Sequence, residues 1–108
     1  MSKNYLFVLS ATEKNRCNCV LWARDQVPSL PFGLWTIIAK KKIINSHKAK
    51  VGSVAIINAG LPFGHVAIVS KVGLNHITIK EANYKHCTIT ERHGSESDLK
   101  ILGYFEPK

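Results

Sequence analysis

The sequence is poor in acidic residues, in cysteine and in long apolar runs. Only seven of its 108 residues are Asp or Glu, against fifteen Lys or Arg, which gives a net charge of +8. Its three cysteines are an odd number without framework spacing, which argues against a small secreted fold held by disulfides and predicts at least one free thiol. No apolar run approaches the roughly 20 residues of a membrane-spanning helix, so we expect no membrane insertion.

The N-terminus carries no clear export signal. Its longest apolar stretch, residues 5–9, is shorter than the roughly 7–15 residues of a signal-peptide core. Cleavage after Ala11 is the alternative. We therefore expect synthesis in the cytoplasm without an export signal of the chain's own.

The positive charge is concentrated in the first half of the chain. Residues 1–54 hold nine Lys or Arg and two Asp or Glu, whereas residues 55–108 hold six and five. Such a balance favours an anionic partner, such as nucleic acid, a membrane surface or an anionic polymer. The simpler interpretation is a solvated surface that keeps a small domain soluble. Most of the excess lies at Lys40, Lys41, Lys42, Lys48 and Lys50.

Local patterns predict a single α+β domain over the whole chain. Asn15 and Asn18 are candidate N-caps for a helix at 19–26, and a second helix is expected from Leu34 to about Lys40. Connections as short as those in the second half join antiparallel strands. We therefore expect N-terminal helices packed on a curled antiparallel sheet of about five or six strands. The expected strands are 51–58, 64–72, 76–82, 87–91 and 100–105.

Side-chain alternation in two of these strands brings polar residues together. His65 lies at the start of one strand, and Glu81 and Asn83 share a face at the end of the next. If the two strands pair through the turn at 73–75, their outer ends meet. The pattern therefore predicts His65 close to Glu81 and Asn83.

Cys19 is the candidate nucleophile of the chain. It is expected in the first turn of a helix, where the partial positive charge and unpaired N–H groups lower the pKa of a thiol. A cysteine nucleophile also needs a base and a polar group that orients the imidazole, and His65 with Glu81 or Asn83 fits these roles. Any one of these residues alone is more often structural, so the hypothesis depends on their combination.

Four sequence blocks occur in order between about residues 15 and 92. They are Asn-Cys-Val-Leu-Trp-Ala-Arg at 18–24, Val-Gly-Ser-Val-Ala-Ile at 51–56, Gly-His-Val-Ala-Ile-Val at 64–69 and Ile-Lys-Glu-Ala-Asn-Tyr at 79–84. Together they resemble the CHAP family of cysteine, histidine-dependent amidohydrolases and peptidases.

The resemblance implies a papain-like α+β fold that needs no cofactor and no metal. It implies a nucleophile at Cys19, a general base at His65, an imidazole-orienting carboxylate at Glu81 and a fourth polar member at Asn83. The backbone N–H of Cys19, with the Asn18 side chain, is the expected oxyanion hole.

The family mostly cleaves amide bonds of bacterial peptidoglycan, between muramic acid and the stem peptide or within the peptides. Its usual settings are phage lysins, virion-associated lytic proteins and wall-remodelling enzymes. The resemblance therefore implies a hydrolase that acts at the bacterial cell wall or in the periplasm. We expect a monomer, alone or as part of a larger phage particle, and no nucleic-acid partner.

The sequence departs from the family in two places, and we expect no separate wall-binding domain within its 108 residues. Cys17 precedes Asn18 where small residues are more usual, and Ser53 replaces an acidic residue. Trp22 is expected in the core. The candidate substrate-binding residues are Trp35 and the basic run Lys40, Lys41 and Lys42, which we expect to form a wall-adhesion surface.

Several alternatives stay open. Cys17, Cys19, His86 and Cys87 offer four zinc ligands, although Cys-x-Cys is tighter than the usual ligand spacing. Cys17 is also expected to bond to Cys19 or Cys87 under oxidising conditions and so to silence the enzyme. The alternative functions are a cysteine amidase acting on a non-wall peptide conjugate, a basic nucleic-acid-binding module without any recognisable motif, and a degenerate domain kept for assembly.

Overall fold

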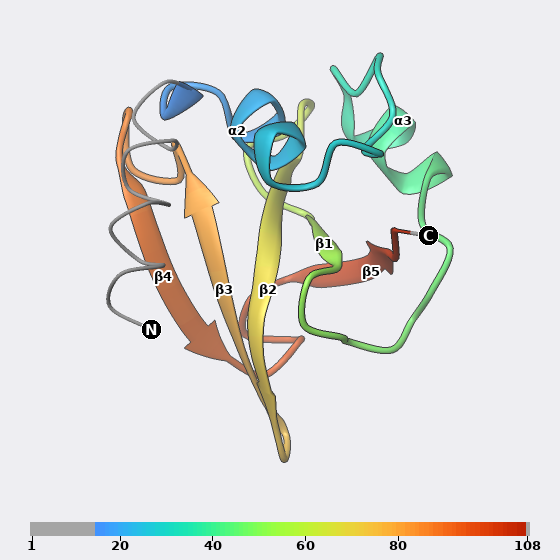
Figure 1. Ribbon diagram of the computed structural model, residues 1–108, viewed down its shortest axis with the longest axis vertical. Coiled ribbons are helices and arrows are strands. Elements are labelled where there is room, and N and C mark those ends of the chain that lie inside the picture. Colours follow the sequence, from blue (N-terminus) through green and yellow to red (C-terminus); the bar gives the residue numbers. More distant parts are fainter. Residues whose placement is uncertain (1–14, 108) are drawn as a thin grey trace.

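The computed structural model describes residues 15–107, in which two α-helices lie against one end of a five-stranded antiparallel sheet (Figure 1). The helices are α2 (Cys19–Gln26) and α3 (Ile37–Lys42). The strands are β1 (Val54–Ile57), β2 (His65–Gly73), β3 (His76–Ala82), β4 (Ile89–Gly94) and β5 (Ile101–Phe105). The predicted α+β class is confirmed. The alternative of cleavage after Ala11 falls outside the described residues.

Helix α2 has the predicted bounds because both of its ends have local signals. The Asn18 side chain accepts hydrogen bonds from the N–H groups of Val20 and Leu21, each at 3.0 Å, and so caps the N-terminus. The C-cap is Val27, directly before Pro28, which disfavours helical geometry at the residue before it. Cys19 is therefore the first helical residue.

Helix α3 begins three residues later than expected from Leu34, at Ile37, and ends two residues later. The reason is its N-cap, Thr36, whose hydroxyl accepts from the N–H of Ala39 at 3.1 Å. Leu34 is instead a core residue of the preceding loop, and Trp35 is exposed.

The sheet has the order β4-β3-β2-β1-β5, and all neighbouring strands are antiparallel. Strands β2 and β3 follow the predicted bounds closely. The strand expected at 51–58 shortens to β1, because residues 50–53 form a turn in which Ser53 bonds back to Lys50. The strand expected at 87–91 begins at Ile89, because residues 83–88 form a turn with Asn83 and Cys87 at positive φ.

Strand β1 lies between two hydrophobic clusters, because its alternate side chains point to opposite faces of the sheet. Val54 and Ile56 pack with Trp22 of α2, which is only 1% exposed. Ala55 packs on the other face with Tyr104 of β5. The expectation that Trp22 belongs to the core is confirmed.

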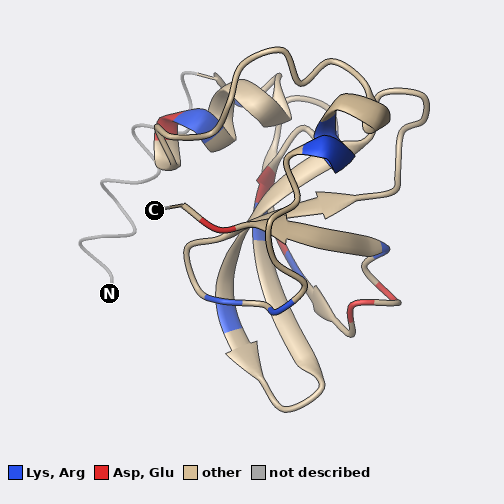
Figure 2. Cartoon of the chain, turned by 90° about the vertical axis from the view of Figure 1, so that its right-hand side faces the viewer, with Lys and Arg blue, Asp and Glu red and all other residues tan. Residues whose placement is uncertain are grey.

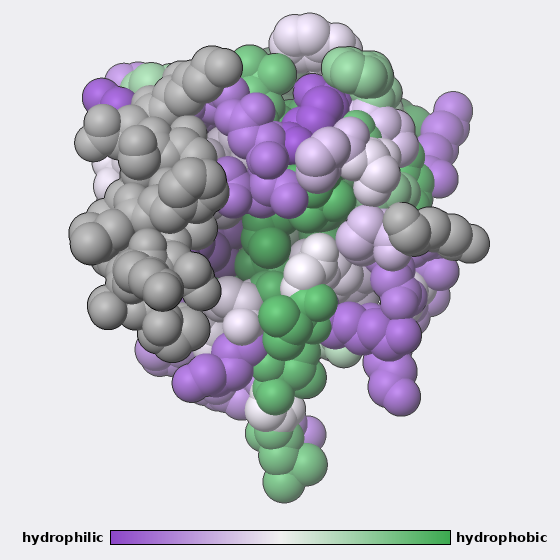
Figure 3. Space-filling model, in the orientation of Figure 1, coloured by the Kyte–Doolittle hydropathy of each residue, from purple (hydrophilic) through white to green (hydrophobic). Residues whose placement is uncertain are grey.

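Basic residues lie on both helices and along the sheet (Figure 2). Hydrophobic side chains extend down to the tip of the β2–β3 hairpin, where Val72 and Leu74 are exposed (Figure 3). None of the helices in residues 15–107 is long and apolar enough to cross a membrane.

Candidate active site

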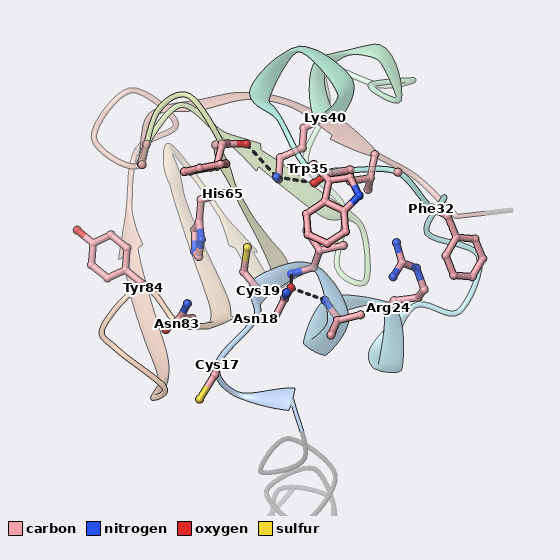
Figure 4. A pocket seen from close by; sticks show the side chains of 18 residues that line it. Cys17, Asn18, Cys19, Arg24, Phe32, Trp35, Lys40, His65, Asn83 and Tyr84 are labelled. Atoms are coloured by element: carbon pink, nitrogen blue, oxygen red, sulfur yellow. Dashed lines mark hydrogen bonds between the residues drawn. The ribbon is translucent and has the colours of Figure 1, made fainter.

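A cleft of about 850 Å³ lies between the start of α2 and the sheet (Figure 4). Two loops border it: the 32–35 rim, which carries Trp35, and the 59–64 rim, which leads into β2. The turn after β3 contributes Asn83 and Tyr84. Cys19 and His65 both line this cleft, so the topology brings the candidate nucleophile and the candidate base to one place.

Cys19 is a free thiol in the first turn of α2. Its side chain lies next to that of His65 in the cleft (Figure 4), and the imidazole lowers the pKa of the thiol. The fold fixes this approach because α2 packs against β2 and β3. The thiol therefore lies at the junction of the helix and the sheet.

His65 is the first residue of β2 and is 6% exposed. Its Nε2 lies 2.9 Å from Oε1 of Glu81, near the end of β3. This contact leaves Nδ1 as the ring nitrogen for the thiol. Cys19, His65 and Glu81 thus lie in a line. Strand alternation predicted that His65 and Glu81 would be close, and they are in contact.

The charges in this line favour a thiolate next to an imidazolium. Burial alone raises the pKa of Cys19, but the hydrogen bond and charge of His65, the N–H of Val66 and the ammonium of Lys40 bring that pKa below its ordinary value. Burial alone lowers the pKa of His65, yet its contacts with Cys19 and Glu81 raise it to about 9. Between these two values the pair is ionised.

Glu81 is completely buried and has a second cationic partner that the sequence reasoning missed. Arg92 of β4 binds both carboxylate oxygens, with Nε at 2.6 Å from Oε2 and Nη2 at 3.0 Å from Oε1. Its guanidinium also stacks on Tyr84, 3.6 Å from the ring centre. Burial raises the pKa of Glu81, but the bonds to His65 and Arg92 bring it below its ordinary value, so the carboxylate stays charged.

The register of the β3–β4 hairpin places Arg92 there. Glu81 pairs with Thr90, and Arg92 is two residues further along the same face of β4. The sequence alone does not show that Arg92 lies diagonally opposite Glu81, because this register depends on the length of the turn between β3 and β4.

Asn83 and Asn18 line the cleft, but their carbonyl oxygens have structural partners. Asn83 Oδ1 accepts from the N–H of Cys87 at 2.7 Å, so it shapes the turn after β3. Asn18 Oδ1 caps α2. The side-chain oxygen of each residue therefore serves the local backbone structure.

The candidate substrate-binding residues separate into two groups. Trp35 is 76% exposed on its rim, and Lys40 also lines the cleft. Lys40 is only 2% exposed, so the expectation that it belongs to an adhesive outer surface is wrong. Its side chain turns inward from α3 toward backbone carbonyls, whereas Lys41 and Lys42 are exposed.

The other two cysteines form a disulfide, Cys17–Cys87, which leaves Cys19 as the free thiol. One of the two predicted pairings is therefore present, and the prediction of a free thiol is confirmed. The zinc alternative is wrong, because two of its four ligands are bonded to each other. Residues 15–107 contain no group of three or more side chains able to hold a metal ion.

The chain is similar to known proteins at the level of its family. The sequence profile of the CHAP domain matches residues 10–83. The chain belongs to the CHAP family. No protein among curated sequences matches it significantly.

Two solved structures of Ly7917 match part of the chain. The crystal structure of Ly7917 has a TM-score of 0.50 and 28% sequence identity, covering 57% of this chain and 29% of that one. A second structure of Ly7917, with the hydrolysing product of MDP, matches with a TM-score of 0.49, again at 28% identity, 57% of this chain and 29% of that one. This CHAP chain thus matches less than a third of the length of Ly7917.

Proposed function

We propose that this CHAP domain is a cysteine hydrolase that cleaves amide bonds of bacterial peptidoglycan. The observation that carries the proposal is the line from Cys19 through His65 to Glu81 at the cleft, with His65 Nε2 at 2.9 Å from the buried carboxylate. Membership of the CHAP family supports an amidohydrolase or peptidase activity. The peptidoglycan substrate follows from what the family usually cleaves.

The reaction begins with attack by the Cys19 thiolate on the amide carbonyl carbon. The carbonyl oxygen becomes an oxyanion, for which the N–H of Cys19 and the side-chain NH₂ of Asn18 are the proposed donors. The N-cap does not use that N–H, since Asn18 Oδ1 binds those of Val20 and Leu21. The cap therefore leaves the N–H of Cys19, in the same residue as the attacking sulfur, for the oxyanion.

His65 moves the protons of both half-reactions. Protonated His65 gives its proton to the leaving amine, the C–N bond breaks, and a thioester forms on Cys19. Neutral His65 then takes a proton from water, and the resulting hydroxide attacks the thioester carbon. The C–S bond breaks, the carboxylic acid leaves, and the thiolate of Cys19 next to protonated His65 is restored. Glu81 is the proposed partner that holds the imidazole and favours its charged form.

The rims are the proposed substrate-binding walls. Trp35 and Phe63 are exposed there at 76% and 61%, and both line the cleft. Flat aromatic side chains offer apolar area for sugar or peptide groups at low entropic cost. Asn83 is proposed as a further polar contact at the opposite side of the cleft.

The enzyme is proposed to act at the bacterial cell wall or in the periplasm, as a monomer or within a phage particle. Exposed Lys41 and Lys42 are proposed to attract the anionic wall, since clustered positive charge concentrates an anionic polymer. Lys40 is not part of this surface.

The test is digestion of purified peptidoglycan followed by mass spectrometry of the products. Wild-type protein is expected to clear a peptidoglycan suspension and to create one new amine terminus, which identifies the bond as muramoyl amide or peptide. Cys19→Ala is expected to abolish both effects. Circular dichroism checks that it folds. Equal clearing by Cys19→Ala contradicts the proposal, as does a wild type that releases no new amine from walls of two chemotypes.

A further inference from the structure

Lys40 is a buried cation beside the proposed active site. It is 2% exposed, although its neighbours Lys41 and Lys42 on the short helix α3 are exposed. Burial of an ammonium group is costly unless hydrogen bonds and opposite charge compensate for it. Within residues 15–107, no carboxylate forms an ion pair with Lys40.

Backbone carbonyls from both rims of the cleft bind this ammonium. Lys40 Nζ donates to the carbonyl of Leu34 at 2.8 Å and to that of Phe63 at 2.9 Å (Figure 4). The first carbonyl belongs to the 32–35 rim and the second to the 59–64 rim. One side chain therefore links two loops that are far apart in the sequence.

Cys19 lines the same cleft as Lys40, and its thiolate is a charge of opposite sign (Figure 4). Burial lowers the pKa of Lys40, and the charge of the Cys19 thiolate raises it again. The charges of His65 on β2 and of Lys40 on α3 both lower the pKa of the Cys19 thiol. Arg24 of α2 also lines the cleft, but its guanidinium is bound to the carbonyls of residues 30 and 31.

We propose that Lys40 is a positioning residue of this site, which holds the two rims together through their carbonyls and fixes a positive charge that stabilises the Cys19 thiolate. The inference deepens the proposed function, because the proposed reaction starts from that thiolate. His65 moves protons and Lys40 does not. The charge of His65 therefore changes during the reaction, whereas that of Lys40 stays the same.

The test is the rate at which iodoacetamide alkylates Cys19 as a function of pH. Cys17 and Cys87 are bonded to each other, so without reductant the reaction reports on Cys19 alone. Lys40→Met is expected to move the midpoint to higher pH and to slow alkylation below the midpoint by about three- to tenfold. Lys48→Met, which removes the same charge from an exposed lysine away from the cleft, is expected to match wild type, and Lys40→Arg is expected to retain the wild-type midpoint for the most part.

A wild-type midpoint in Lys40→Met contradicts the inference, and so does an equal shift in Lys48→Met. Thermal melting checks that each variant folds. If Lys40→Met does not fold, Lys40→Gln is compared with Lys40→Arg: a raised midpoint in the Gln variant alone supports the inference, and equal midpoints contradict it.

Alkylation needs no wall substrate, so the two proposals fail separately. A protein that leaves peptidoglycan intact but shows the Lys40 effect contradicts only the proposed function. A protein that cleaves peptidoglycan without the Lys40 effect contradicts only the inference.

Discussion

The two sides of the cleft are built in different ways. The helix side takes its thiol from a short segment with local signals, in which Asn18 caps α2 directly before Cys19. The sheet side takes its charges from three strands, with His65 on β2, Glu81 on β3 and Arg92 on β4. The position of the Cys19 thiol on the helix side thus depends on residues next to it in the sequence. The contacts among His65, Glu81 and Arg92 on the sheet side depend on how the strands pair.

This difference predicts that the sheet side is sensitive to the loss of a single charge. Glu81→Gln keeps the size of the side chain but removes the carboxylate from between His65 and Arg92. We expect activity to fall by about 10²- to 10⁴-fold, because the imidazole loses the partner that orients it and favours its charged form. Initial rates of peptidoglycan clearing measure the loss. A Glu81→Gln variant within threefold of wild type contradicts the role of the network.

The pH dependence of the wild-type rate is expected to report on a group from each side of the cleft, Cys19 and His65. The active form needs the Cys19 thiolate and protonated His65. Activity should rise as pH passes the lowered pKa of Cys19, and it should fall as pH passes the pKa of His65, about 9. Each limb changes about tenfold per pH unit.

Rates of a small soluble substrate over a wide pH range measure both limbs. A single limb, or a fall in activity that begins near pH 6.5, the ordinary value for histidine, contradicts the ion pair.

The Cys17–Cys87 disulfide joins the helix side to the turn after β3, so its removal tests how much each side depends on the other. The double variant Cys17→Ser, Cys87→Ser is expected to lose about 2–4 kcal/mol in free energy of unfolding, mostly by loosening the constraint on the unfolded chain. Urea denaturation measures this loss. A change below 0.5 kcal/mol contradicts a structural role for the bond.

The same disulfide changes the expectation about oxidation. Cys17 was expected to silence a cysteine enzyme by bonding to Cys19 or Cys87, but the bond that forms leaves Cys19 free. Under mild oxidation we therefore expect wild-type activity to persist. The silencing hypothesis stays a prediction only for the Cys17–Cys19 pairing, and peptide mapping after oxidation identifies which pair forms.

The smallest effect is expected on the exposed face of α3. Replacement of Lys41 and Lys42 by Gln should weaken adsorption to peptidoglycan by a few-fold and leave cleavage of a small soluble substrate unchanged, because neither residue lines the cleft. Sedimentation of the protein with walls measures adsorption. An equal loss of wall adsorption and of soluble-substrate cleavage would contradict the prediction, because it would indicate that these charges stabilise the fold.

The parts that the sequence predicted are those with local signals. The Asn18 cap and Pro28 define α2, and alternation within neighbouring strands brought His65 and Glu81 together. The partnership of Arg92 with Glu81 depends on the turn at 83–88, whose length shifts the start of β4, and no local pattern reports that register. The inward direction of Lys40 depends on carbonyls at residues 34 and 63, which meet only in the folded chain.

The central claim is that Cys19 forms an acyl-enzyme with the carbonyl side of a peptidoglycan amide. The direct measurement is intact-protein mass spectrometry after a soluble muropeptide is mixed with wild-type protein and the reaction is stopped in acid within its first turnover. The account predicts a mass increase equal to the acyl fragment, mapped to Cys19 and missing in Cys19→Ala. Turnover without any adduct on Cys19, or with an adduct on another residue, would contradict it.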